Sequence, residues 1–327
     1  MSVDTYSVSG TGQPFRHTLP PPPQRPVAAS QCYQAYAASI VMGALTWLAL
    51  TRFAPANDPF SNGLMVTVVA TFVIYVFSIR NDNSSIYDPY WVIAPPLLAL
   101  GIKADSAAGF GAWHPRDVLI VFCLLFWATR YHVFYAWDGW KTGLSIEDWR
   151  YENMRSFPGP YWLHSLLGMH YFPTFLVYFA FAPAALVLGT APLQQPELGF
   201  WDLVGVAGAV SATLIQYVAD RQCADFRRSA AYEHGATIRT GLWKYSRHPN
   251  YFGEVLFWCS MIPFALGAGL FSDHALLILA GPIAMGVFFR FSAWLMDVRS
   301  LERRPDFQTA IDETSAMLPW WPKRSDS

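Results

Sequence analysis

Long stretches without a charged side chain limit what this sequence can fold into. From Val255 to Ser272 there is no charged residue at all. An apolar block of roughly 17–25 residues is long enough to cross a bilayer as a helix. Charged residues make up 14% of the 327 positions and hydrophobic residues 53%, whereas a soluble domain has about 25% charged residues. The sequence therefore predicts an integral, multi-pass membrane protein in contact with the lipid bilayer.

Eight apolar segments are candidate membrane-spanning helices. They cover residues 31–51, 62–79, 89–102, 118–137, 168–189, 199–219, 250–271 and 274–295. The third segment is short and contains Pro95 and Pro96, so seven spans remain an alternative to eight. Proline is tolerated in such helices where neighbouring helices satisfy the carbonyls that it frees. We therefore expect an all-α, polytopic helical bundle with seven or eight transmembrane helices.

The N-terminal end differs in composition from the rest of the chain. Residues 1–30 are polar and contain the run LPPPPQRP, from Leu19 to Pro26. Proline-rich polar segments are typical of disordered tails. We expect a disordered tail over residues 1–30 and one membrane domain over residues 31–327.

The distribution of lysine and arginine predicts the orientation in the membrane. With eight spans, 17 of these residues fall in the tails and even-numbered loops, and 3 fall in the odd-numbered loops. Basic residues concentrate on the cytoplasmic side, so both tails are predicted to be cytoplasmic. The membrane would be the endoplasmic reticulum in a eukaryote or the inner membrane in a bacterium. Three polar motifs share that face: Arg80–Trp91, Glu147–Arg155 and Gly241–Glu254.

The third motif, GLWKYSRHPNYFGE, stands directly before the apolar block that starts at Val255. Asn250 and Glu254 are one helical turn apart, so their side chains share a face. Polar groups at the end of a membrane helix are unfavourable unless they are paired or solvated. A helix N-terminus favours phosphate, and arginine offers planar donors to its oxygens. The motif predicts a pocket for a large, flat, phosphate-bearing ligand, although any single arginine can serve orientation alone.

Two classes of function are disfavoured by composition. The formal net charge is −1, which gives no general attraction to nucleic acid. The histidines and the four cysteines show no metal-ligand spacing, so we expect no metal site and read the cysteines as free thiols. The oligomeric state is not predicted by the sequence.

Three segments taken together resemble the steroid 5-alpha-reductase superfamily, and more closely its large bacterial and protist branch. They are Gly241–Glu254, Ala219–Arg228 (ADRQCADFRR) and Arg303–Lys323 (RRPDFQTAIDETSAMLPWWPK). The resemblance is strongest over residues 217–323 and extends more weakly from Ser84 onward. It implies NADPH as the cofactor and a lipid-like substrate, either a 3-oxo steroid, a sterol or an enoyl lipid.

The resemblance also assigns roles to individual residues. Cofactor contact is carried over to Asp220, Arg227, Tyr245, Asn250, Glu254 and Trp258. Arg247 and His248 match the pattern of the bacterial branch and are expected to bind the cofactor as well. In the family, a tyrosine polarises the substrate carbonyl, and Tyr131 in WATRYHVFYAW is the candidate for it. Tyr131 also fits an interfacial aromatic side chain. The acidic partner of the tyrosine has no clear match, and Asp88 and Glu147 are the candidates.

Two other classes of function remain open. Membrane methyltransferases of the isoprenylcysteine or phospholipid type also use an Arg-His-Pro-x-Tyr segment, with S-adenosylmethionine. They typically follow it with paired glutamates, whereas the stretch Met296–Phe307 here contains only Glu302. A non-enzymatic membrane protein such as a transporter is the other alternative. The sequence favours a membrane reductase of a carbon–carbon double bond.

Overall fold

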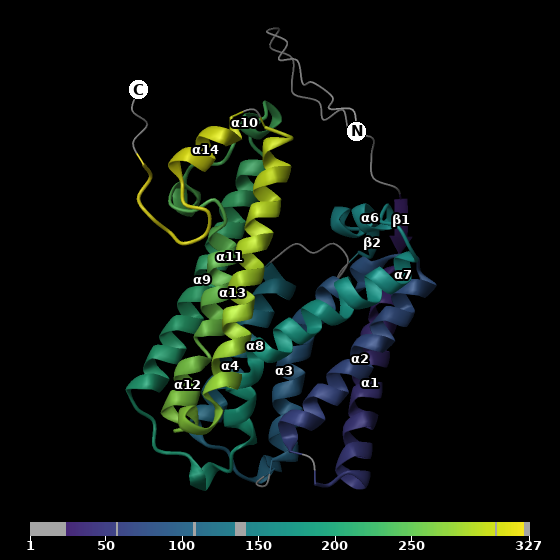
Figure 1. The fold of residues 1–327 in the computed structure, drawn as a ribbon, viewed down its shortest axis with the longest axis vertical. Coiled ribbons are helices and arrows are strands. Elements are labelled where there is room, and N and C mark those ends of the chain that lie inside the picture. The colour runs from purple at the N-terminus through teal and green to yellow at the C-terminus, as the bar shows by residue number, and fades with distance from the viewer. Residues whose placement is uncertain (1–23, 57, 107–108, 135–141, 305, 324–327) are drawn as a thin grey trace. The chain divides into compact units, whose positions relative to one another are not determined.

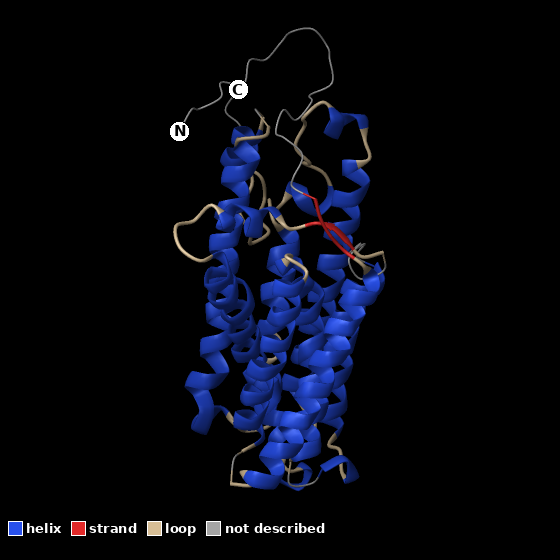
Figure 2. Cartoon of the chain, turned by 90° about the vertical axis from the view of Figure 1, so that its right-hand side faces the viewer, coloured by secondary structure: helices blue, strands red, loops and turns tan. Residues whose placement is uncertain are grey.

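The computed structural model describes residues 24–56, 58–106, 109–134, 142–304 and 306–323. Helices make up nearly all of its regular structure, and the strands form one short pair (Figures 1 and 2). The predicted all-α membrane helical bundle is confirmed. The fold follows from the sequence because the long apolar blocks can satisfy their backbone groups internally only as helices.

The first half of the chain contains four long helices and a connecting region. The helices are α1 (Ala29–Phe53), α2 (Pro59–Arg80), α3 (Tyr87–Asp105) and α4 (Pro115–Thr129), which continues as a π-helix over Arg130–Phe134. After the connecting region come α6 (Trp149–Arg155), α7 (Tyr161–His164), a π-helical stretch over Ser165–Tyr171 and α8 (Phe172–Gly189).

The second half contains α9 (Phe200–Arg227), α10 (Ala230–Glu233), α11 (Pro249–Cys259), α12 (Ile262–Gly267), α13 (Phe271–Leu301) and α14 (Phe307–Glu313). The span predicted over residues 250–271 is divided into α11 and α12. A turn at Ser260 and Met261 separates the two helices, and a proline in the first turn of α12 favours a new helix start there.

Five helical segments in the described part of the chain are long and apolar enough to cross a membrane. They are α1, α2, the continuous stretch Tyr161–Gly189, α9 and α13. The other three predicted spans correspond to shorter elements: α3 with its two internal prolines, α4 with the π-helix, and the α11–α12 pair. Residues 135–137 of the fourth predicted span lie outside the described residues. The number of seven or eight spans therefore stays a prediction.

The predicted disordered tail is wrong for residues 24–30, and residues 1–23 lie outside the described residues. Strand β1 (Gln24–Val27) pairs antiparallel with β2 (Leu144–Ile146), and α1 begins two residues later. Gly143 has a φ of +88°, and a Cβ there would lie 2.4 Å from the carbonyl oxygen of Val27. Glycine therefore permits the close approach that pairs the strands.

The chain divides into two compact units, where the sequence predicted one domain over residues 31–327. The larger unit contains residues 21–217 and 250–289, and the smaller unit contains residues 218–249 and 290–327. The smaller unit falls largely within the stretch 217–323, where the family resemblance is strongest.

The core of the larger unit is apolar and aromatic. Its buried side chains include Ile102, Leu124, Trp127, Phe181 and Phe264. Two ion pairs are buried as well: Nζ of Lys103 lies 2.7 Å from Oδ2 of Asp117, and Nε of Arg116 lies 2.6 Å from Oδ1 of Asp202. Two of the three basic residues assigned to the odd-numbered loops are thus paired inside the protein.

The smaller unit is held together by contacts between the loop after α10 and the C-terminal segment. The amide and hydroxyl of Thr237 both donate to the carboxylate of Asp306, at 3.0 and 2.7 Å. The Ser246 hydroxyl donates to the carbonyl of Met317, and the amide of Trp320 donates to the carbonyl of Tyr245. These bonds fix the motif Gly241–His248 against residues 306–320.

Candidate functional site

Glu254 is the buried centre of a cage of hydrogen-bond donors in the larger unit. Its side chain lies on α11, one turn after Asn250, and the residue is 2% exposed. Oε1 accepts from the indole Nε1 of Trp258 at 2.8 Å. Oε2 accepts from the indole Nε1 of Trp127 at 3.1 Å and from the hydroxyl of Tyr131 at 2.9 Å. The carboxylate therefore accepts hydrogen bonds from three aromatic side chains.

The donors from the first half of the chain come from α4 and the π-helix that follows it. Trp127 is on the last turn of α4, and Tyr131 is in the π-helix over Arg130–Phe134. Single π-helical turns are frequent at functional sites, where they redirect side chains. Trp91 of α3 packs against both rings, with centroids 5.7 Å from Trp127 and 5.4 Å from Tyr131. The cage walls are therefore aromatic on several sides.

Arg130 and Gln216 extend this site on the face of the Tyr131 ring. The guanidinium of Arg130 lies 3.9 Å from the centroid of the Tyr131 ring, and its Nη1 donates to Oε1 of Gln216 at 2.7 Å. Nε2 of Gln216 is buried and has no hydrogen-bond partner among the residues that the structure describes. It is a donor available to an oxygen of a bound molecule.

A glycine on α11 explains how Gln216 is placed. A Cβ at Gly253 would lie 2.5 Å from Cγ of Gln216 and 2.9 Å from the carbonyl oxygen of Ala212. Any larger residue would push α9 away from α11. The glycine directly before Glu254 thus lets the two helices approach closely, which brings the Gln216 carboxamide beside the helix that carries the carboxylate.

In the smaller unit, Arg247 and His248 share one carboxylate. Nη2 of Arg247 lies 2.7 Å from Oδ2 of Asp297, and Nε2 of His248 lies 2.8 Å from Oδ1 of the same residue. Nη1 of Arg247 also donates to the carbonyls of Ile311 and Thr314. The guanidinium predicted to contact a cofactor is therefore engaged in fastening the C-terminal segment to α13.

The other predicted cofactor residues differ in how available they are. The side chain of Arg227, on the last turn of α9, is exposed and forms no ion pair with a described residue. Asp220 and Asn250 are half-buried. The ring of Tyr245 is half-buried and meets Trp321 edge-on, at 5.4 Å between centroids. Arg227 is thus the more available of the two predicted arginines.

Asp88, one of the two candidate acids, lies in the first turn of α3 and pairs with a tyrosine. The hydroxyl of Tyr151 donates to its Oδ1. Shielding from water raises the pKa of Asp88 to about 7, against the attraction of Arg150, which lowers the pKa. The carboxyl group therefore titrates near neutral pH. No bond between Asp88 and the cage around Glu254 is found among the described residues.

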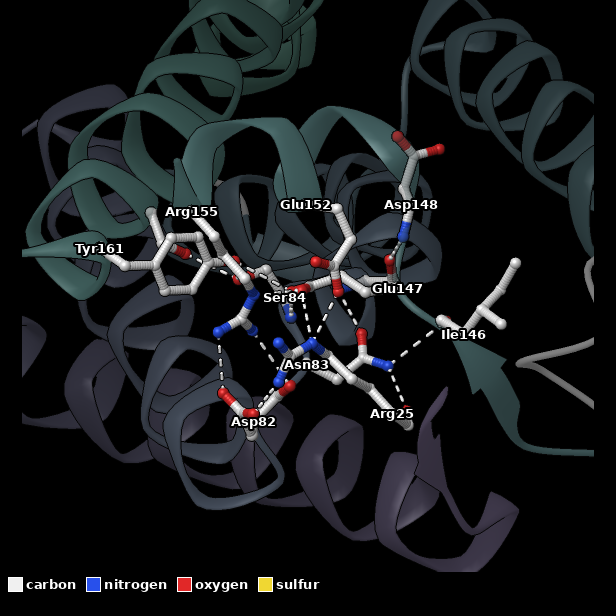
Figure 3. Close-up of polar contacts among 12 residues, drawn as sticks. Arg25, Asp82, Asn83, Ser84, Ile146, Glu147, Asp148, Glu152, Arg155 and Tyr161 are labelled. Carbon is white, nitrogen blue, oxygen red and sulfur yellow. Dashed lines mark hydrogen bonds and ion pairs between the residues drawn. The ribbon is translucent and has the colours of Figure 1, made fainter. Parts of the chain in front are cut away.

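Glu147, the other candidate acid, is the centre of a polar network at the junction of β1, β2 and the α2–α3 turn (Figure 3). Oε1 accepts from the amide of Ser84 at 2.5 Å and from the hydroxyl of Tyr161 at 2.9 Å. Oε2 accepts from Nε of Arg155 at 2.7 Å, and Nε of Arg25 lies 3.6 Å away. Both oxygens are engaged, which fits a structural role.

The same network ties the N-terminal strand to the rest of the larger unit. Arg25 also pairs with Glu152 and with Asp82, and Asp82 in turn pairs with Arg155 (Figure 3). The side-chain amide of Asn83 donates to the carbonyl of Arg25 at 2.7 Å. This network gives a physical reason for the order of residues 24–27.

The structure therefore brings together one predicted catalytic residue, Tyr131, with two predicted cofactor residues, Glu254 and Trp258. It keeps Asp88 and Glu147 in separate polar networks. Sequence reasoning did not single out Trp127, Gln216 or Asp297. The sequence did indicate an acidic partner such as Asp297, because an Arg-His pair beside a membrane helix requires a counter-charge. The positions of Trp127 and Gln216 depend on helix packing.

Comparison with known proteins identifies relatives of the chain without a described activity. The profile of the family described as "Protein of unknown function (DUF1295)" matches residues 74–314. A relative from Schizosaccharomyces pombe, "Uncharacterized protein C594.04c", is 24% identical over 287 residues, which is 80% of each chain. No solved structure matches. The family match covers every predicted site residue.

Proposed function

This chain belongs to the DUF1295 family of proteins of unknown function, and we propose that it is a membrane-embedded, NADPH-dependent reductase. The substrate is a lipid-like molecule with an activated carbon–carbon double bond: a 3-oxo steroid, a sterol or an enoyl lipid. The proposal extends the likeness of Gly241–Glu254 and its flanking motifs to the steroid 5-alpha-reductase superfamily. Both tails are cytoplasmic in this proposal, and a reporter fused after Ser327 should be active only in the cytoplasm; activity on the opposite side would contradict it.

The observation that carries the proposal is the hydrogen bond between Tyr131 and Glu254. The resemblance required a tyrosine with an acidic partner, and the sequence offered no acid with a clear match. In the structure, the Tyr131 hydroxyl lies 2.9 Å from Oε2 of Glu254, inside a cage of tryptophans. A tyrosine and a carboxyl group in hydrogen-bond contact form a pair able to deliver a proton to a substrate oxygen.

The residues present fit NADPH in each unit taken by itself. Arg227 is exposed in the smaller unit, and an arginine–phosphate contact is charge-assisted and strong. In the larger unit, Oε1 of Glu254 accepts a hydrogen bond from Trp258, and a carboxylate oxygen can accept a second. The buried Nε2 of Gln216 is a free donor among described residues. An acceptor and a donor of this kind suit the carboxamide of a nicotinamide.

Each residue of the site has its own role in the proposed reaction. NADPH, when bound, supplies the hydride for the β-carbon of the activated alkene. Tyr131 donates its hydrogen bond to the substrate oxygen, where negative charge develops. The Tyr131 proton passes to that oxygen, and Glu254, in its protonated form, donates to the Tyr131 hydroxyl and replaces the proton, so that the substrate gains one hydride and one proton. The tryptophan cage excludes water, which strengthens these interactions in the site.

A cofactor-binding experiment tests the proposal against a methyltransferase. The purified protein in detergent is heated with NADPH, with NADH or with S-adenosylmethionine, and its melting temperature is recorded. We expect NADPH to raise the melting temperature, because a ligand that binds only the folded state stabilises it. A rise with S-adenosylmethionine alone would replace the reductase with a methyltransferase, and no rise with any of the three would favour a non-enzymatic protein.

A further inference from the structure

A cavity in the larger unit is lined by α1, α2 and α3, and none of the three donors to Glu254 described above comes from these helices. Its volume is about 710 Å³, which falls within the range of about 300–1,000 Å³ typical of small-molecule sites. It runs along α1 from Ser39 to Thr51, a length of about 18 Å at the rise of an α-helix. We call this cavity the α1–α3 groove.

The groove opens among apolar side chains that face outward. Ile40 and Leu48 of α1 and Leu97 of α3 line it, and Leu48 is 66% exposed. Helices α1 and α2 are two of the segments long and apolar enough to cross a membrane, and they pack against each other (Figure 1). A groove with such a rim is in contact with the hydrocarbon of the bilayer.

Small residues keep the groove open. Gly43 of α1 and Gly101 of α3 both line it. A Cβ at Gly101 would lie 2.6 Å from the ring of Trp47. The glycine therefore makes room for the Trp47 indole, which lies in the wall of the groove.

Two residues that line the groove each carry a buried polar atom with no partner in the described part of the chain. Nε1 of Trp47 and Oγ1 of Thr67 are buried and form no hydrogen bond with any residue that the structure describes. Other hydroxyls of the lining are satisfied: Ser39 donates to the carbonyl of Ala70, and Thr51 donates to the carbonyl of Leu48. Buried polar groups are nearly always hydrogen-bonded, so an oxygen atom of a ligand would complete this wall.

The charged residues of the lining limit the class of ligand that the groove can bind. Asp105 is the charged residue among those that line the groove, and its carboxylate accepts from the side-chain amide of Asn62 at 2.7 Å. No lysine or arginine lines it within the described residues. An anionic phospholipid headgroup would find no counter-charge there, whereas an uncharged hydroxyl or ketone meets a donor in Trp47 and a donor and acceptor in Thr67.

We propose that the α1–α3 groove binds a membrane lipid with a long apolar body and a single uncharged oxygen, which pairs with Thr67 or with Trp47. This site is separate from Glu254 and does not depend on the proposed reduction. The ligand is held by its apolar body along α1 and α3 and is selected by its oxygen.

Melting temperatures of the full chain in detergent test the role of the oxygen. The probes are cholesterol and farnesol, each compared with its hydrocarbon counterpart, cholestane or farnesene. We expect the wild-type protein to be stabilised more by the alcohol than by the hydrocarbon. That difference should disappear in Thr67→Val or in Trp47→Phe, whichever residue pairs with the oxygen. Equal shifts for alcohol and hydrocarbon in the wild type, or an unchanged difference in both variants, would overturn the proposal.

The Thr67 variant separates ligand binding from general damage. Replacing an unpaired buried hydroxyl with a methyl group does not remove a protein hydrogen bond. Without lipid, Thr67→Val should therefore melt at the wild-type temperature or above it. A lower melting temperature without lipid would show that Thr67 has a partner in the protein, which would contradict its role as a ligand donor.

Filling the groove gives a second, independent test. Ala44 lines the groove, whereas its neighbour Leu45 is 53% exposed and does not line it. Ala44→Phe should abolish stabilisation by all four probes, and the matched variant Leu45→Phe should keep it. Normal stabilisation of Ala44→Phe would place the lipid elsewhere. The relative effects of cholesterol and farnesol distinguish a ring system from a linear chain as the apolar body.

Discussion

The hydroxyl of Tyr131 lies 2.9 Å from Oε2 of Glu254, although the two residues are 123 positions apart in the sequence. The contact joins the π-helix after α4 to α11. Two indole groups, from Trp127 and Trp258, donate to the same carboxylate. Glu254 therefore sets the orientation of the tyrosine that the proposed reaction requires.

Glu254→Gln should lower stability as well as activity. Both carboxylate oxygens accept hydrogen bonds, but a glutamine amide accepts only through its single oxygen. One cage donor would then face an NH₂ group. We expect a loss of about 1–3 kcal/mol, the range for leaving a buried polar group unsatisfied, measured by denaturant unfolding in detergent.

A second substitution tests this explanation of the Glu254 cage. Trp258→Phe removes the indole N–H that donates to Oε1. In that background, Glu254→Gln should lower the free energy of unfolding by less than it does in the wild type. Contacting residues show such non-additivity. Strictly additive costs would mean that the cage bonds do not explain the loss.

The two predicted cofactor arginines should behave differently. Arg227→Ala should weaken NADPH binding by about 1.5–3 kcal/mol, the range for a hydrogen bond to a charged group, and leave the melting temperature unchanged, because its side chain is exposed. Arg247→Ala should lower the melting temperature, because Asp297 and the carbonyls of Ile311 and Thr314 lose their donor. Titration calorimetry and thermal unfolding measure the two effects. The reverse pattern would assign the phosphate contact to Arg247.

The raised pKa of Asp88 predicts how stability depends on pH. Its folded-state pKa is about 7, above the ordinary value of 3.8. Between these values the unfolded chain releases the proton and the folded protein keeps it, so stability from this group is present below about pH 4 and is lost as pH rises through about 7. Asp88→Asn should remove this contribution to the dependence of stability on pH. Melting temperatures are measured from pH 4 to pH 8. If they change with pH in the same way in the variant and in the wild type, the raised pKa of Asp88 is contradicted.

Glu147 and Glu152 offer a matched comparison in the network of Figure 3. Glu147→Gln leaves Arg155 and Arg25 without their buried partner, and breaking a buried pair typically costs about 3–5 kcal/mol. The side chain of Glu152 is 17% exposed and, among the residues that the structure describes, pairs with Arg25, so Glu152→Gln should cost less. If Glu147→Gln folded with wild-type stability but abolished turnover, Glu147 would return as the catalytic acid.

The helices could be predicted because apolar blocks of membrane length have few alternative structures. The start of α11 at Pro249 follows from the change of composition there, and the shared face of Asn250 and Glu254 follows from helical spacing. The strand β1 was not predicted, because its order depends on a remote partner, β2, and on Arg25 meeting Glu147 and Glu152.

The composition of the site was only partly predictable. A family motif indicated Glu254, Trp258 and, less directly, Tyr131. That these residues meet depends on how α4 packs against α11, which no local pattern encodes. The same holds for the pairing of Arg247 with Asp297. The sequence indicates that a buried guanidinium needs an anion, but it does not identify the anion.

Turnover with the intact protein tests the central claim most directly. The purified protein is mixed with NADPH and a panel of enone lipids, including a 3-oxo-4-ene steroid, and NADPH oxidation is followed together with the mass of the lipid product. We predict a product two hydrogen atoms heavier for at least one lipid, with turnover lost in Tyr131→Phe while the melting temperature stays near that of the wild type. Wild-type turnover in Tyr131→Phe, or NADPH that neither binds nor is oxidised with any lipid of the panel, would contradict the assignment of this site as a reductase.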